Sequence, residues 1–145
     1  MEVYLIKALY IILLLICSYT DIRYRSLSVG ILAIFAVAGV GTLLLYEGIE
    51  YFLRPDIYLS PLPGLLLLIM SKVTHEDIGE GDACLLMVMG CFLDIWNNLL
   101  FFMLSSLLAG VYALILYLKR RNAKEVFPFV PFMAVAGFVL CITGR

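Results

Sequence analysis

The sequence predicts an all-α integral membrane protein, a bundle of about six transmembrane helices. Of its 145 residues, 64% are hydrophobic and 14% are charged, whereas soluble domains average roughly 45–50% and about 25%. Six apolar stretches are long enough, or nearly so, to cross a hydrocarbon core of about 30 Å. In lipid each stretch must satisfy its own backbone, so we expect helices. The net charge of −1 gives no electrostatic basis for binding nucleic acid.

In chain order, the stretches are residues 3–20, 27–46, 57–73, 83–96, 99–118 and 127–143. Pro61 and Pro63 interrupt the start of the third stretch, and the fourth is short. The sixth opens with Pro128 and Pro131, at a helix start where a missing N–H group does least harm. We expect all six to form one transmembrane domain over residues 1–145.

The basic residues predict the orientation of this bundle. With six spans, one side of the membrane would carry Arg23, Arg25, Lys72, Lys119, Arg120, Arg121 and Lys124, and the other Lys7, Arg54 and Arg145. The 7-to-3 split of the 10 basic residues places the first group in the cytoplasm, because basic loops stay inside. Both termini would then be extracytoplasmic. A cleaved signal peptide is disfavoured because Glu2, and no basic region, precedes the first apolar stretch.

Metal-ligating residue types do not form a recognisable site. Cys17, Cys84, Cys91 and Cys141 all fall in apolar stretches without paired zinc spacing, which favours buried free thiols. His75 precedes Glu76 and Asp77, but the second histidine of a His-Glu-x-x-His zinc site is absent. We therefore expect no metal and no cofactor.

Two of the eleven acidic residues stand apart from solvated loops. We expect Asp21 to end the first helix, and Asp82 closes Gly79-Glu80-Gly81-Asp82 immediately before the fourth. The predicted orientation places both at the cytoplasmic side. Carboxylates beside membrane-embedded segments are costly to bury and are candidates for function.

A pair of neighbouring aspartates suits peptide hydrolysis. Two carboxylates held close share one proton near neutral pH, so one can activate water while the other protonates the scissile carbonyl. Gly79 and Gly81 could leave room for an extended substrate backbone. The alternatives are structural: Asp82 could N-cap the fourth helix, and Asp21 could pair with nearby Arg23 or Arg25.

The string from Gly79 to Leu86, with Gly90 after it, resembles the GxGDxKLxxxxG motif of the type IV prepilin peptidases. Asp21 resembles their first catalytic aspartate. The Phe-Pro-Phe-Val-Pro-Phe run over residues 127–132 is similar to the start of the family's last helix. The resemblance covers essentially the whole chain and implies an aspartyl endopeptidase with Asp21 and Asp82 as its catalytic pair.

The chain departs from the family pattern in two places. Cys84 stands where the motif usually has lysine, and Leu27-Ser28-Val29 replaces a common Ile-Pro-Asn. We expect no N-terminal methyltransferase portion of the kind that bifunctional members carry. The chain therefore resembles the short branch of Tad-type prepilin peptidases and archaeal preflagellin peptidases.

The resemblance implies a prepilin or pilin-like substrate whose basic leader is removed at the cytoplasmic face of a prokaryotic cytoplasmic membrane. Glu76, Asp77 and Glu80 form an acidic cluster that could attract this leader, or could be merely solvated. A different class of function stays open: a non-catalytic membrane subunit that binds pilin-like helices or an assembly partner. The oligomeric state is not predicted.

Overall fold

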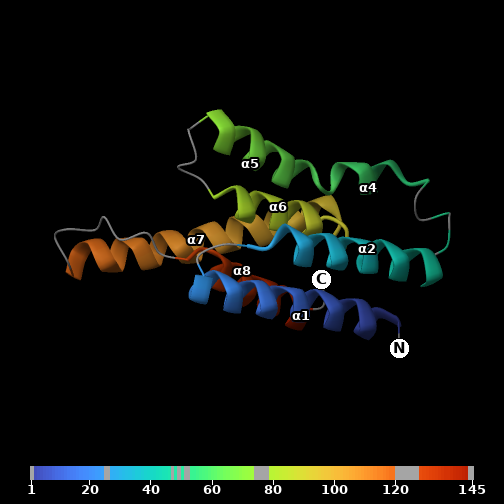
Figure 1. The fold of residues 1–145 in the computed structure, drawn as a ribbon, viewed down its shortest axis with the longest axis horizontal. Helices are drawn as coiled ribbons and strands as arrows, with labels where there is room; N and C mark the ends of the chain where they lie inside the picture. Colours follow the sequence, from blue (N-terminus) through green and yellow to red (C-terminus); the bar gives the residue numbers. More distant parts are fainter. Residues whose placement is uncertain are drawn as a thin grey trace.

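The structure, a computed structural model, describes residues 2–24, 27–46, 48, 50, 53–73, 79–119 and 128–143. Within this part of the chain every regular element is an α-helix, which confirms the all-α prediction. The helices are α1 (Glu2–Tyr24), α2 (Val29–Tyr46), α4 (Pro55–Leu59), α5 (Leu62–Val73), α6 (Glu80–Met89), α7 (Ile95–Lys119) and α8 (Val130–Ile142). They run roughly along one long axis (Figure 1).

The third apolar stretch forms two helices, α4 and α5, as its prolines suggested. Pro55 starts α4, and Ser60 ends it with a backbone bond to Ile57. The amide of Leu65 then donates to the carbonyl of Pro61 at 3.0 Å, which opens α5. The break falls at Pro61 because proline has no N–H to continue the ladder of α4.

The predicted fourth helix, residues 83–96, is wrong at both ends. Helix α6 begins at Glu80 and ends at Met89, while Trp96 belongs to α7. Gly90 closes α6 by donating its N–H to the carbonyls of Leu86 and Met87 at 3.2 and 3.1 Å. The chain then turns until Asp94, whose carbonyl accepts the first bond of α7 at 2.8 Å. The apolar composition of residues 91–93 concealed this turn.

Helix α6 lies near the middle of the bundle. It packs against α5 on one side and α2 on another, while α1 packs against α8 and α8 against α7. Figure 1 shows α6 between α5 and the α1–α8 pair. The short helix therefore connects two groups of helices that are distant in sequence.

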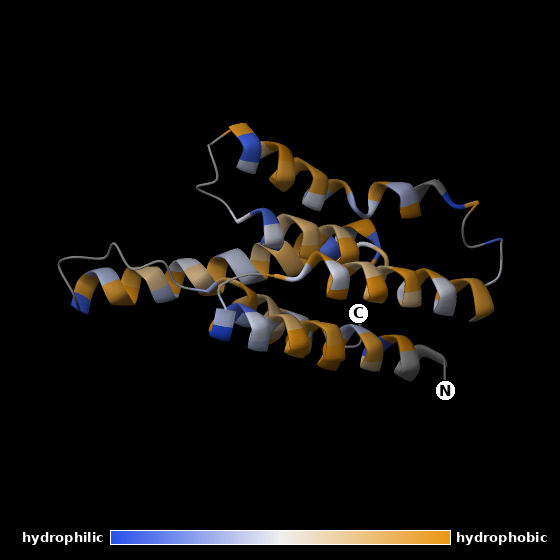
Figure 2. Cartoon of the chain, in the orientation of Figure 1, coloured by the Kyte–Doolittle hydropathy of each residue, from blue (hydrophilic) through white to orange (hydrophobic). Residues whose placement is uncertain are grey.

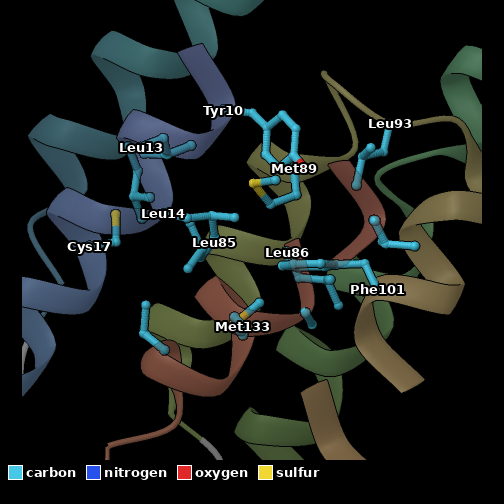
Figure 3. Close-up of a cluster of buried hydrophobic side chains, with 14 residues drawn as sticks. Tyr10, Leu13, Leu14, Cys17, Leu85, Leu86, Met89, Leu93, Phe101 and Met133 are labelled. Carbon is cyan, nitrogen blue, oxygen red and sulfur yellow. The ribbon is translucent and has the colours of Figure 1, made fainter. Parts of the chain in front are cut away.

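Side chains from four helices meet in the core beside α6. Its Leu85, Leu86 and Met89 are fully buried with Leu13 of α1 and Phe101 of α7. The close-up in Figure 3 shows Met89 beside Tyr10 and Leu85 beside Leu14. Helix α8 contributes fully buried residues to the same cluster: Val130, Met133 and Ala136. These contacts hold the start of α6 in a defined position relative to α1 and α8.

The outer surface of the bundle is strongly apolar. Leu45, Val37 and Leu118 are 82%, 73% and 74% exposed, and hydrophobic colouring covers much of most helices in Figure 2. By length and composition, one helix among the described residues could cross a membrane: Ile95–Lys119, whose most apolar stretch is only 17% buried. Val29–Leu45, Ile57–Val73 (which α4 and α5 divide between them) and Val130–Ile142 are shorter apolar helical segments.

Candidate active site

Asp82 lies inside the first turn of α6 and does not cap it. The N-cap is Gly79, in an extended conformation with φ −61° and ψ 120°, and it offers no side-chain hydrogen bond. The amide of Asp82 donates to the Gly79 carbonyl at 3.1 Å. The next residue, Ala83, is fully buried. The N-capping alternative for Asp82 is therefore wrong, because α6 starts at Glu80, three residues earlier than the sequence suggested.

Gly79 and Gly81 make room for neighbouring side chains of the protein itself. A Cβ atom at Gly79 would lie 2.9 Å from Oδ2 of Asp82. A Cβ atom at Gly81 would lie 3.1 Å from both Cβ and Cδ1 of Leu27, just before α2. The first glycine thus leaves space for the Asp82 carboxylate, and the second lets the start of α2 approach α6 closely.

Asp21 lies in the last turn of α1, beyond the apolar run that ends at Thr20. Helix α1 continues to Tyr24, so Asp21 does not end it as expected. Its Oδ2 accepts a hydrogen bond from the backbone amide of Val130 at 3.2 Å. Val130 is the first residue of α8 and is fully buried. The carboxylate of one helix thus meets the N-terminus of another that is 109 residues away in sequence.

The two aspartates interact electrostatically. Burial and then the negative charge of Asp21 raise the pKa of Asp82 from 3.8 to about 7. Burial also raises the pKa of Asp21, while the hydrogen bond from the Val130 amide lowers it. Both carboxylates lie outside the apolar stretches that the sequence predicts to span a membrane. Near neutral pH such a pair holds about one proton, which is the state that acid–base hydrolysis of a peptide needs.

The predicted acidic cluster is only partly described. Glu80, at the start of α6, is exposed, whereas Glu76, Asp77 and His75 lie outside the described residues. In the described ranges no three His, Cys, Asp or Glu side chains gather in a way that could hold a metal ion.

Cys84 follows Asp82 by two positions and is partly buried as a free thiol. It packs against the hydrophobic core cluster. The position where the family motif usually has a lysine therefore contributes an apolar contact here.

The amide of Val130 is the part of this site that the sequence did not indicate. Pro128 and Pro131 predicted a helix start in this region, but a backbone donor carries no residue-specific signal. Only the packing of α8 against α1 brings that donor to Asp21.

Comparison with known proteins agrees with the motif. A sequence model described as the type IV leader peptidase family matches residues 8–114, a range that includes Asp21 and Asp82. No curated protein and no solved structure matches the chain significantly. With most of its length matched, the chain belongs to the type IV leader peptidase family, the family of the prepilin peptidases.

Proposed function

We propose that this protein is an aspartyl endopeptidase that removes the basic leader of prepilin or pilin-like precursors, with Asp21 and Asp82 as its catalytic pair. Membership of the leader peptidase family supports the reaction and the substrate class. The observation that carries the assignment of residues is the interaction between the two carboxylates, in which the charge of Asp21 helps raise the pKa of Asp82 to about 7.

The proposed reaction needs neither a covalent enzyme intermediate nor a metal. One aspartate takes a proton from water as the water attacks the peptide carbonyl, and the other protonates the carbonyl oxygen. The tetrahedral intermediate then collapses as the protons move back. A shared proton lets each aspartate perform both tasks.

The surface of the bundle supports a multi-pass membrane location. Large apolar side chains are exposed along α1, α2, α5 and α7, and lipid is the solvent that would cover them at least cost. The excess of basic residues in alternate loops would direct the Asp21 and Asp82 ends of α1 and α6 to the cytoplasm. The basic leader of a precursor would then reach the pair from the side on which it is made.

The exposed carboxylate of Glu80, together with Glu76 and Asp77, could bind the leader. We expect charge reversal of all three to raise KM for a native precursor, and added salt to weaken its binding in the wild type. Unchanged kinetics in both tests would remove leader binding from the proposal.

Cleavage of a co-reconstituted prepilin by the wild type, Asp21→Asn and Asp82→Asn tests the catalytic pair. Both substitutions are expected to abolish processing, because the side-chain amide of asparagine can neither take a proton from the attacking water nor protonate the peptide carbonyl. Asp94→Asn is the matched control: Asp94 is an exposed aspartate at the turn between α6 and α7, and its loss should leave processing unchanged.

Processing by both variants at the wild-type rate would refute the mechanism. Loss in only one of them would assign a structural role to the other aspartate. If the wild type cleaves none of several prepilins, the non-catalytic subunit becomes the better explanation.

A further inference from the structure

The start of α8 presents a backbone donor to Asp21. The first N–H groups of a helix have no partner within the helix, and in α8 the amide of Val130 donates instead to Oδ2 of Asp21 at 3.2 Å. The next residue, Pro131, has no N–H. The amide of Phe132 turns back to the carbonyl of Phe129 at 3.0 Å. The helix start thus directs its Val130 donor to one carboxylate of the pair.

The second carboxylate has a different environment. Asp82 is partly buried, beside the fully buried Ala83 and close to the backbone of Gly79. Within the described residues, no hydrogen bond reaches its carboxylate. The N-terminus of α6 itself favours a negative charge there, but burial and the charge of Asp21 both act against it. Burial raises the pKa of both carboxylates, but among the described residues a hydrogen bond opposes that rise only at Asp21.

From this asymmetry, and resting on the function proposed above, we infer that the Val130 amide is a positioning group that keeps Asp21 ionised as the general base and leaves Asp82 as the general acid. The hydrogen bond is stronger to an ionised carboxylate than to the carbonyl oxygen of a neutral carboxyl group, and it also orients the oxygen that accepts it. The dipole of α8 favours the same charge at Asp21.

The assignment defines the direction of each proton transfer. Asp21 takes a proton from water, whose oxygen bonds to the carbonyl carbon, while Asp82 gives its proton to the carbonyl oxygen. In the second step Asp82 recovers a proton from a hydroxyl of the resulting diol, and Asp21 gives its proton to the amide nitrogen. The carbon–nitrogen bond breaks, which releases a carboxylic acid and an amine. The pair returns to its starting state.

Among the described residues, few other charges act on Asp21. The titratable groups that interact with it are Cys17 on its own helix and Asp82 on α6, and the exposed Arg23 lies two positions further along α1. Helix α8 offers only Cys141, near its far end, and the described side chains of α2 include no titratable group. A change in the pKa of Asp21 after loss of the Val130 N–H can therefore be traced to that bond.

The test replaces the amide of Val130 with an ester. Nonsense suppression with 2-hydroxy-3-methylbutanoic acid at position 130 keeps the side chain and removes the N–H. The pKa of Asp21 is read from its ¹³C carboxyl shift across a pH titration in detergent micelles, with the resonance assigned by its absence from Asp21→Asn. We expect this pKa to rise by about one unit, the equivalent of one hydrogen bond to a charged group.

The matched control is an ester at Met133. Its amide donates to the carbonyl of Phe129 at 3.4 Å, and that carbonyl is the one the Val130 ester also weakens. The Met133 ester thus perturbs the same helix start but keeps the Val130 donor, and it should leave the pKa of Asp21 unchanged. Equal shifts in both variants, or no shift in either, would overturn the inference.

Kinetics supply an independent readout. The acidic limb of the pH profile of kcat/KM should move to higher pH in the Val130 ester by the same amount as the pKa of Asp21, with KM little changed. A wild type that cleaves no prepilin would defeat the proposed function, whereas the ¹³C titration would still decide whether Val130 controls Asp21. The two proposals can therefore fail separately.

Discussion

The α5–α6 pair and the α1–α8 pair each contain one of the two aspartates, and each pair approaches closely at glycine. In the α5–α6 region, a Cβ atom added at a glycine would collide with backbone atoms. Gly64 faces the backbone of Met87, and a Cβ at Gly90 would lie 2.6 Å from the Ser60 carbonyl oxygen. In the α1–α8 pair, Gly137 faces the side chains of Leu14 and Tyr10. Backbone cannot move aside, whereas the ends of side chains can. We therefore expect the α5–α6 pair, which carries Asp82, to be the more rigid of the two.

The polar contacts of the α5–α6 region also differ from those of the α1–α8 pair. Nδ2 of Asn98, which is fully buried on α7, donates to the carbonyls of Ser60 and Leu86 at 2.7 and 3.3 Å, so it ties the α4–α5 break to α6. Helix α8 is held to α1 by flexible side chains. Tyr10 donates to the Gly137 carbonyl, and Lys7 donates to the Cys141 carbonyl at 3.5 Å.

The largest expected effect is that of Gly90→Ala. The new Cβ would meet the backbone of Ser60 and Pro61 at 2.6–2.7 Å, so we expect a loss of more than about 3 kcal/mol of unfolding free energy. Thermal unfolding in detergent micelles measures it. Gly110→Ala is the control, since nothing lies within 4 Å of its Cβ position. Equal stability of the two variants would contradict the proposed rigidity of the α5–α6 region.

Replacing Asp82 should change how the free energy of unfolding depends on pH. An unfolded Asp82 releases its proton near its ordinary value of 3.8, whereas the folded one holds it up to about 7. The stability linked to neutral Asp82 is thus fully present below about pH 4 and is lost as the pH rises through 7. Asp82→Asn cannot ionise, so at pH 8 it should exceed the wild type by up to about 2 kcal/mol, allowing for solvent screening.

The comparison with Asp21 sharpens this prediction. Asp21→Asn should gain less at pH 8, because the bond from the Val130 amide already favours the ionised carboxylate. Unfolding midpoints of both variants between pH 4 and pH 8 provide the measurement. A larger gain for Asp21→Asn would reverse the assignment of base and acid.

Gly137→Ala should have a moderate effect. The added methyl group would press on the end of the Leu14 side chain, which can rotate, so we expect a loss of about 1–2 kcal/mol. Combined with Leu14→Val, part of this loss should return because the two changes share one contact. Strict additivity of the two substitutions would show that the α1–α8 contact does not adjust as described.

The smallest effect on stability is expected for Gly81→Ala. Its Cβ would lie 3.1 Å from Cβ and Cδ1 of Leu27, a contact that is relieved if the chain before α2 shifts by a few tenths of an ångström, while alanine favours the helix by about 1 kcal/mol. The unfolding midpoint should therefore change little. Gly79→Ala, unlike Gly81→Ala, should shift the ¹³C titration curve of Asp82, because the Cβ atom of the new alanine would lie 2.9 Å from the Asp82 carboxylate. If Asp82 titrated identically in Gly79→Ala and in the wild type, Gly79 would not set the position of Asp82.

The local sequence predicted much of the helical pattern. The apolar stretches, the proline break near Pro61 and the helix start near Pro131 all follow from rules that act within a few residues. The end of α6 was missed because Gly90 turns the chain inside an apolar run, where composition does not change. Asp21 and Asp82 could be singled out because charged residues are rare beside apolar stretches.

The sequence by itself determined the all-α class, the membership of the leader peptidase family and the two aspartates that the proposal uses. Only the tertiary structure decided that Asp21 meets the amide of Val130 and that its charge acts on Asp82. The physical reason is distance along the chain. A helix or a turn depends on neighbouring residues, whereas a bond across 109 residues depends on how α1 and α8 pack. That packing rests on the shape of a whole interface, which no local pattern encodes.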